Sequence, residues 1–493
     1  MDGNIARSFV SRATSAWTGP DPPGPFPGAI ERREVSEIRP SDSNASSNPS
    51  RSSATALPAS APLSEDAAQK PLSLERSARG ARASLALHNL RGAAVAFVVM
   101  THSSLAYVAS ADSSGYAFDR PPYQWLAFPV LDRSRWLGFD IFCAWQDAYL
   151  MALWFFLSGV FTWPSLERAG SKRFLARRVV KLGGALLFGL AVVMPLALYP
   201  VYRLSAPDPS LAGYIHAYRA LPFIPNGPIW FLWMLLTLNV VVAALHRWAR
   251  RAVEALGSLA SALASRPVLA FTAFAIVLIA AYAPLAIAFT PWRWADYGPF
   301  AVQYCRPLLY AAYFLLGLIA GRQGLGRGML NADGFLAKRW RALLGLAVAA
   351  FGLWMALIGL SLKLGDQTPA ALEPLTDASF AVAGLTSVLL ALAAAFRFGT
   401  TRRPLAGALA EKALPIYLVH YAPVVWLQYV LLDLPLPAVA KGAIVFVGAL
   451  AISWGLAAGP GWLESYRAAA AAKAVALNAG VNPPTPKSRR SDA

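Results

Sequence analysis

Long runs of apolar residues, each close to twenty residues in length, recur through the middle of the chain. A helix of about twenty apolar residues crosses the roughly 30 Å hydrocarbon core of a bilayer. Backbone polar groups in lipid must be paired within the protein, and the alternating ten-residue segments of a membrane β-barrel are absent from the sequence. We therefore expect an all-α, polytopic integral membrane protein with about ten transmembrane helices. The expected spans are 88–109, 138–163, 179–200, 228–246, 267–289, 302–321, 342–362, 378–396, 411–432 and 438–458.

The composition indicates a membrane protein and excludes soluble enzyme folds. Hydrophobic residues make up 56% of the 493 residues, charged residues only 14%, and the mean hydropathy is +0.45, whereas about 25% charged residues is usual in soluble domains. The net charge of +18 is explained by basic cytoplasmic loops, so the lipid bilayer is an expected partner and nucleic acid is not. Two cysteines, Cys143 and Cys305, indicate neither a disulfide framework nor a metal site.

The two ends of the chain differ in composition from the apolar middle. Residues 1–84 are rich in Ser, Pro, Ala and Arg, which predicts a disordered tail, and 459–493 is expected to be a second solvated tail. When loops are assigned alternately to the two sides of the membrane, one side carries nineteen Lys and Arg and the other nine. Cytoplasmic loops carry the excess, so both tails are expected in the cytoplasm, with a membrane domain over 85–458.

The first span contains two polar residues that are expensive in lipid, Arg91 and His102. They are eleven residues apart, so at 100° per residue they lie on one helical stripe, about 16 Å apart along the axis. Arg91 near the cytoplasmic mouth is suited to hold a phosphate or carboxylate, and His102 near mid-membrane is suited to remove a proton from a hydroxyl. Alternatively, Arg91 extends to the membrane interface and His102 bonds a neighbouring carbonyl.

The second span carries Asp147, which is deep enough to need a partner such as a protonated histidine. Near its cytoplasmic end, Ser158 and Gly159 are small residues that let helices approach closely. The basic cluster that follows is suited to bind the phosphates of a cytoplasmic nucleotide, and anchoring to the membrane surface explains it equally well. This cluster contains Arg173, Arg177 and Arg178.

Later spans add aromatic and polar candidates for a substrate cavity. Trp230 opens the fourth span at the expected outer interface, where tryptophan is more often a membrane anchor than a binding group. Tyr417 and His420 are three residues apart on one face of the ninth span. They form either a buried hydrogen-bonded pair or one wall of a substrate cavity.

Taken together, these segments resemble the membrane acyltransferase-3 family over about 85–458. The resemblance rests on LHNLRG with His102 ten residues further on, then FFLSG and RFLARR, then GPIWFL and finally IYLVH. It is closest in style to the branch that contains the succinyltransferase of periplasmic glucan synthesis. Two positions depart from the pattern: His88 stands where aspartate is common, and Ala152 where this branch often has proline.

The resemblance implies a membrane O-acyltransferase of the bacterial plasma (inner) membrane. Such an enzyme moves an acyl group, here acetyl or succinyl, from cytoplasmic acyl-CoA to a hydroxyl of an extracytoplasmic glycan, lipid or small molecule. The family's arginine and histidine correspond to Arg91 and His102, its basic run to Arg173, Arg177 and Arg178, and its late tyrosine and histidine to Tyr417 and His420. Acyl-CoA is then a donor substrate, with no bound cofactor or metal.

A proton-coupled transporter or flippase is the main alternative, because His102, Asp147 and His420 would equally serve as a proton relay. A lipid-linked sugar transferase is a third interpretation. It would be expected to carry an acidic metal-binding loop, and the acids of the outer loops are too scattered to form one.

Overall fold

The structure is a computed structural model that describes residues 65–111, 117–121, 123–263 and 265–478. The chain divides into two compact units, one containing 19–76 and the other containing 77–493. Within the first unit, Glu65–Arg76 is the described part and is helical. The description below concerns the second unit, which holds the membrane domain.

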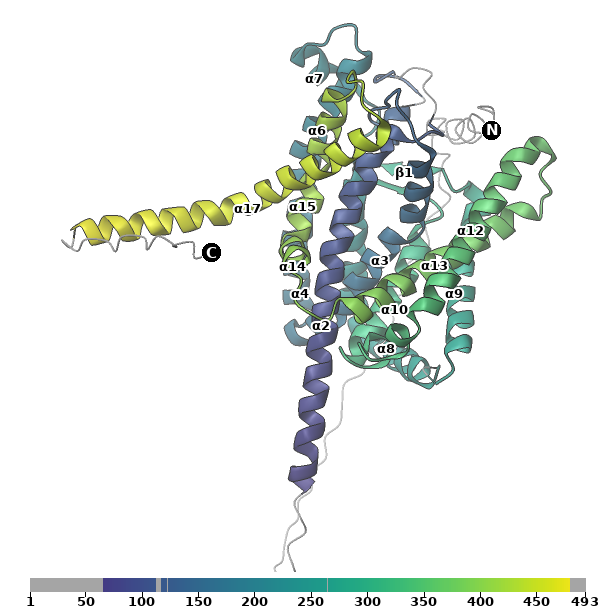
Figure 1. The fold of residues 1–493 in the computed structure, drawn as a ribbon, viewed down its shortest axis with the longest axis vertical. Coiled ribbons are helices and arrows are strands. Elements are labelled where there is room, and N and C mark those ends of the chain that lie inside the picture. The colour runs from purple at the N-terminus through teal and green to yellow at the C-terminus, as the bar shows by residue number, and fades with distance from the viewer. Residues whose placement is uncertain (1–64, 112–116, 122, 264, 479–493) are drawn as a thin grey trace, which may run out of the picture. The chain divides into compact units, whose positions relative to one another are not determined.

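Helices make up most of this unit, which confirms a helical membrane fold (Figure 1). The long helices are α2 (Glu65–Ser104), α3 (Leu137–Ala169), α8 (Trp230–Leu263), α9 (Pro267–Phe289), α10 (Pro307–Gln323), α12 (Trp340–Leu364), α13 (Leu372–Phe398) and α17 (Ala438–Asn478). The shorter ones are α4 (Ser171–Arg178), α5 (Gly184–Phe188), α6 (Met194–Ser205), α7 (Leu211–Ala220), α11 (Phe335–Lys338), α14 (Pro404–Glu411), α15 (Ala413–Val419) and α16 (Tyr421–Val430). The strands β1 (Trp294–Tyr297) and β2 (Phe300–Gln303) pair antiparallel in a hairpin that sequence analysis did not anticipate.

Eight helices within the described ranges are long and apolar enough to cross a membrane, and a ninth span is possible if α15 and α16 are one bent crossing. The stretch expected to cross at 302–321 instead divides between the end of β2 and α10, whose 17 residues make it shorter than any of the eight. The third crossing is one continuous helical path, Ser171–Ser205, interrupted by two π-helical turns. The count of about ten and the cytoplasmic placement of both termini stay predictions.

The two expected tails are helical where the structure describes them. Helix α2 begins at Glu65, so 65–84 is helical rather than disordered, and 1–64 lies outside the described residues. Helix α17 continues from the last span through the expected tail to Asn478, and 479–493 lies outside the described residues. A run rich in Ala, such as 468–477, has high helix propensity, which explains this continuation.

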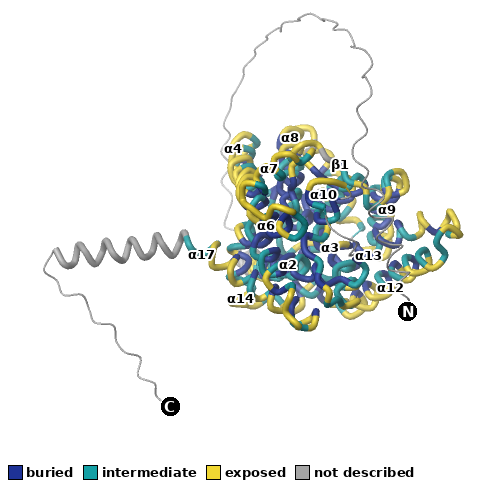
Figure 2. Tube along the Cα trace, turned by 90° about the horizontal axis from the view of Figure 1, so that it is seen from above, coloured by how far each residue is buried: buried dark blue, intermediate teal, exposed yellow. Residues whose placement is uncertain are grey.

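Two helices form the centre of the unit, and others lie at its edge. In the apolar windows of α13 and α3, 72% and 67% of the residues are buried, against 22% in α9, α12 and α17. Figure 2 shows the same contrast, with buried positions gathered around α2, α3 and α13 and exposed ones along α12 and α4. The peripheral helices therefore present their apolar side chains to lipid.

The basic loops of the chain meet at one end of the unit. Arg322 bonds Glu254 at 2.9 Å, Arg82 pairs with Asp333, and Asn89 donates to the carbonyl oxygen of Gly399 at 2.7 Å. These bonds bring together the N-terminal part of α2 and the basic segments 247–266, 322–341 and 397–412, which we call the basic end. Helix α2 runs from this end and finishes at Ser104, on the side where α7 and the hairpin lie, which we call the hairpin end (Figure 1).

Helices α3 and α10 approach each other through glycines. A methyl group at Gly159 of α3 would overlap the backbone of Phe314, and one at Gly317 or Gly321 of α10 would overlap the backbone of α3. Gly317 and Gly321 form a G-x-x-x-G pair, the spacing that lets membrane helices come into backbone contact. The close approach predicted at Gly159 is therefore present, and α10 is its partner.

Replacing Gly317 with leucine is expected to force α10 away from α3 and to lower the free energy of unfolding by at least 1–3 kcal/mol, roughly the cost of overpacking a core. Gly352→Leu in α12 is the matched control, because a side chain there meets no neighbouring atom. Thermal unfolding of the two purified variants in detergent measures the difference. Equal melting temperatures would show that the glycine contact does not stabilise the fold.

Candidate active site

Two histidines that are 318 residues apart in the chain meet at the centre of the candidate site. Nδ1 of His102 lies 3.3 Å from Nε2 of His420, and the ring centroids are 5.0 Å apart. His102 stands in the last turn of α2, toward the hairpin end, and its expected place near mid-membrane stays a prediction. His420 is fully buried, and His102 is partly exposed.

The position of His420 follows from a break in its span. Helices α15 and α16 meet at His420 with a bend of 45°. Pro423, three residues further on, has no backbone N–H and its ring crowds the preceding turn, which is the usual cause of a kink. The bend brings Nδ1 of His420 to 2.6 Å from the carbonyl oxygen of Tyr417.

Carbonyl partners fix the tautomers of both rings. A carbonyl oxygen only accepts, so Nδ1 of His420 carries a hydrogen toward Tyr417 and its Nε2 holds a lone pair. Nδ1 of His102 lies 2.9 Å from the carbonyl oxygen of Val98, so it too carries a hydrogen. That hydrogen faces both Val98 and the Nε2 lone pair of His420. Nε2 of His102 is then a bare lone pair, and no described residue hydrogen-bonds to it.

Neighbouring polar groups hold this pair in place. Gln428 of α16 donates to the carbonyl oxygen of His102 at 2.9 Å, which satisfies a backbone acceptor at the end of α2. The hydroxyl of Tyr417 donates to the carbonyl oxygen of Pro228 and so ties the bend to the start of α8. Tyr421 packs edge-on against His102, with ring centroids 5.5 Å apart. Sequence reasoning missed Gln428, although a glutamine inside an apolar span is itself a signal.

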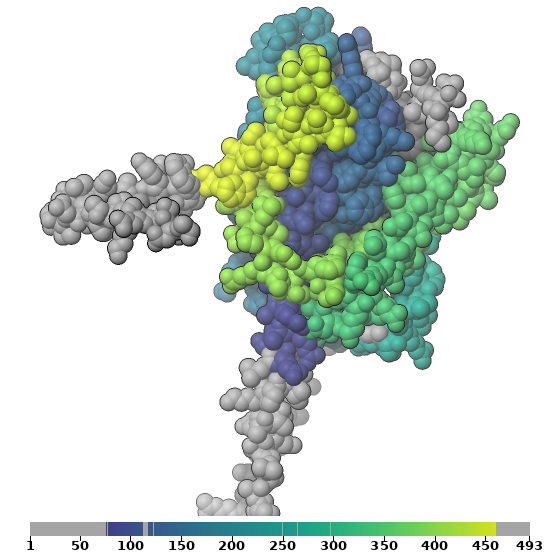
Figure 3. All heavy atoms as spheres, in the orientation of Figure 1, coloured from purple at the N-terminus to yellow at the C-terminus, as the bar shows by residue number. Residues whose placement is uncertain are grey.

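Arg91 lies on α2 toward the basic end and is partly buried. No described acidic side chain pairs with it. Gly92 beside it touches the backbone of Ala406, where a methyl group would overlap. On the face of the molecule seen in Figure 3, α2 is set back between α3 and the segment α14–α16. Arg91 and His102 therefore stand on one helix at different depths, about 16 Å apart.

The three arginines predicted to bind phosphate lie on α4, away from the histidine pair. Arg173 and Arg177 are exposed, while Arg178 is partly buried with its guanidinium 5.1 Å from the ring centre of buried Phe174. No described carboxylate pairs with any of the three. A hollow of about 380 Å³ opens beside them. Its lining includes Lys172, His246 and Arg247, which the sequence analysis did not count among the phosphate-binding candidates.

Asp147 has a different partner from the one predicted. Its carboxylate accepts a hydrogen bond from Arg306 at 2.7 Å, and no described contact joins it to a histidine. The Arg306 side chain is 4% exposed and that of Asp147 is 49% exposed. The guanidinium also lies 4.5 Å from the ring centre of Phe380. Arg306 thus neutralises Asp147 and leaves much of its carboxylate open to other groups.

Trp230 belongs to a row of aromatic rings that ends at the histidines. Its ring stacks on that of Tyr310 at 5.6 Å, one helical turn after Arg306. Phe231 beside it contacts Tyr417 at 5.5 Å, and Tyr417 contacts His420 at 5.7 Å. Trp230, Tyr417 and His420 therefore belong to one continuous row of packed rings, which we call the aromatic wall, with the pair of Asp147 and Arg306 next to its far end. Trp230 is partly exposed, while Tyr417 and His420 are buried.

Among the side chains that the structure describes, no three His, Cys, Asp or Glu residues converge on one point. The titratable groups at the site are the two histidines and neighbouring tyrosines. Such a site can move a proton to and from a hydroxyl.

Comparison with known proteins identifies the family. The model of the acyltransferase domain family Acyl_transf_3 matches residues 84–458. No curated protein and no solved structure matches the chain. The match covers far more than half of the 493 residues and includes every element of the histidine site. The chain is therefore a membrane acyltransferase and belongs to the acyltransferase 3 family.

Proposed function

We propose that this protein transfers an acetyl or succinyl group from cytoplasmic acyl-CoA to a hydroxyl of an extracytoplasmic glycan, lipid or small molecule. The observation that carries the proposal is the bare Nε2 of His102, left free because carbonyl and histidine partners hold Nδ1. A neutral imidazole held in one tautomer is the arrangement that general base catalysis requires.

In the proposed step, Nε2 of His102 takes the proton of the acceptor hydroxyl while the hydroxyl oxygen attacks the carbonyl carbon of the thioester. The carbon–sulfur bond then breaks, the CoA thiolate leaves, and it takes up the proton from His102. While His102 is charged, its Nδ1–H points at the lone pair of His420, which lies 3.3 Å away. His420 is thus a positioning residue that also stabilises the charged ring.

The arrangement of cations supports a donor that enters from the basic end. A CoA thioester carries phosphates at one end of a long flexible arm and the reactive carbonyl at the other. Arg173, Arg177 and Arg178 on α4 are suited to the phosphates because no described carboxylate neutralises them. Arg91 lies on the same stripe of α2 as His102, toward the basic end, and would guide the arm.

The aromatic wall supports an acceptor that approaches along Trp230 and Tyr417. Hydroxylated rings bind well where an aromatic face lies beside a fixed hydrogen-bond acceptor. Asp147 supplies such an acceptor because Arg306 holds one oxygen and almost half of the side chain stays exposed. The acceptor hydroxyl would then reach His102 from the hairpin end, which the positive-inside rule predicts to lie outside the cytoplasm.

The transporter alternative is weakened by the partner of Asp147. A relay through His102, Asp147 and His420 needs the carboxylate within reach of a histidine, and Asp147 bonds Arg306 instead. Acyl transfer remains separable from transport by one product, since only the enzyme releases free CoA thiol.

His102→Ala should lower the turnover of acyl transfer by about 10²–10⁴-fold, the usual contribution of a general base. Thiol release from acetyl-CoA and succinyl-CoA by membranes, with an envelope glycan or lipid extract as acceptor, measures it. His216→Ala, at an exposed position of α7, is the control and should keep wild-type turnover. Wild-type turnover in folded His102→Ala would remove His102 from the mechanism.

His420→Leu should lower kcat roughly 10- to 100-fold, because the charged His102 ring loses a hydrogen-bond acceptor. His420→Gln offers a side-chain oxygen in a similar place and should recover most of the loss. The KM for acyl-CoA should not change in either variant, since His420 is fully buried and therefore takes no part in binding acyl-CoA in the proposed mechanism. Steady-state kinetics with both variants decide, and equal losses in the two would point to a packing role alone.

Arg177→Gln should raise the KM for acetyl-CoA about tenfold at low salt and leave kcat unchanged, because a charge-assisted phosphate contact is lost away from the reacting atoms. Arg266→Gln, at another exposed arginine, is the matched control and should not change KM. Kinetics with acetyl-CoA and with its 3′-dephospho form test whether a phosphate is the group recognised. A tenfold change in both arginine variants would indicate a general surface-charge effect.

A further inference from the structure

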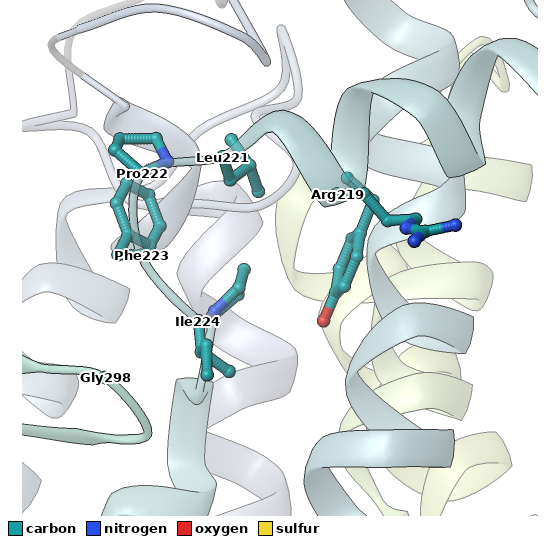
Figure 4. A pocket seen from close by; sticks show the side chains of 8 residues that line it. Arg219, Leu221, Pro222, Phe223, Ile224 and Gly298 are labelled. Atoms are coloured by element: carbon teal, nitrogen blue, oxygen red, sulfur yellow. The ribbon is translucent and has the colours of Figure 1, made fainter.

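A second candidate site lies at the hairpin end, outside the membrane-spanning segments. The last turn of α7, the segment that leads into α8 and the turn of the hairpin enclose a pocket of about 360 Å³. Figure 4 shows Phe223 and Ile224 on one side of it and Arg219 at the other edge, with the Arg219 guanidinium directed outward from the pocket, and Gly298 lies on the hairpin turn. A pocket of this volume holds one ring-sized unit.

Arg219 at the rim of this pocket is a cation that no described acid neutralises. Its side chain is exposed, and it comes from the last turn of a helix. A planar guanidinium in that state matches the geometry of a carboxylate or a phosphate. The opposite wall is apolar, made of Phe223, Ile224 and Pro225, and suits the face of a ring.

Tyr218 lines the same pocket and supplies an unused polar atom. Its hydroxyl is buried and no described group hydrogen-bonds to it. Buried hydroxyls are nearly always paired, so an orphan in a pocket wall points to a missing ligand group. Burial raises the pKa of Tyr218 to about 12, so the hydroxyl stays protonated at neutral pH and can donate as well as accept.

The pocket is tied directly to the histidine site. Pro225 in its wall is followed two residues later by Gly227, which packs against the ring of Tyr421. The next residue, Pro228, accepts the hydroxyl of Tyr417. Three residues span at most about 10 Å of chain, so the pocket opens within the length of a short oligosaccharide from His420.

We propose that this pocket binds an acidic saccharide unit of the acyl acceptor, with the carboxylate or phosphate on Arg219, a ring hydroxyl on Tyr218 and the ring face on Phe223 and Pro225. The inference rests on the proposed transfer to an extracytoplasmic hydroxyl, and it names the acceptor as an anionic chain of two or more units. The unit in the pocket anchors the chain while another unit presents its hydroxyl to His102.

Equilibrium binding to the full-length protein in detergent, without any acyl-CoA, tests this directly. The probes are a glucose trisaccharide, the same trisaccharide with one terminal unit oxidised to a uronic acid, and the same trisaccharide with a terminal phosphate. Calorimetric titration should show at least one anionic probe binding about tenfold or more tightly than the neutral one. The two anionic probes separate a carboxylate from a phosphate as the recognised group.

Substitutions of pocket residues test whether the preference for anionic trisaccharides arises in this pocket. Arg219→Gln should abolish it, and Tyr218→Phe should weaken the binding of all three probes several-fold. Arg120→Gln, at an exposed arginine of another loop, is the matched control and should keep the preference. Equal binding of neutral and anionic probes to the wild type, or a preference that survives Arg219→Gln, would overturn the proposal.

The same titration separates this proposal from the proposed transfer. His102→Ala should keep the preference for the anionic probe, because the base takes no part in the pocket. If thiol release turned out not to depend on His102 while the anionic preference remained and required Arg219, the mechanism would fail and the pocket would stand.

Discussion

The bend between α15 and α16 is the feature on which the candidate site depends. A membrane span must satisfy its own backbone groups, so a break is stable only where other groups replace the lost hydrogen bonds. Here Pro423 removes one donor, and the ring of His420 bonds the carbonyl oxygen of Tyr417 on the other side of the break. The same ring then reaches the end of α2, and Gln428 satisfies the carbonyl oxygen of His102. In a straight helix we would not expect the His420 ring to lie against His102.

Much of the fold was readable from the sequence because the bilayer imposes a single length and a single type of element. The apolar runs predicted the helices, and Gly159 predicted a close helix contact. The errors fall where that constraint is weak. The stretch 302–321 is helical only from Pro307, because its first two residues pair in strand β2 and a short turn follows them. Residues 65–84 are polar in composition, yet they form the first half of α2 and continue into the apolar part of that helix.

The sequence named candidate residues one by one, but it could not name their pairings. Arg91 and His102 share one helix, so their relation follows from the helical repeat alone. The contacts of His102 with His420 and of Asp147 with Arg306 join positions 318 and 159 residues apart. A polar residue in an apolar span indicates that a partner is needed, but the sequence does not indicate which residue that partner is. Arg306 was the better partner for Asp147 because it sits at the head of α10, which the glycines draw against α3.

The depth of His102 constrains how the two substrates can meet. The proposed base, His102, stands in the last turn of α2. In the proposed reaction, the carbonyl of a donor from the basic end has to pass along most of this helix, while the acceptor enters only a short way. Arg91 is partly buried on the same stripe and has no described counter-ion, which suits it to an anionic donor on the proposed route. A thioester arm is thin and flexible, so it suits such a route better than a saccharide does. The position of His102 near one end of α2 therefore suits the proposed substrates. The thin thioester arm would cross from the basic end, and the bulky acceptor would bind at the hairpin end.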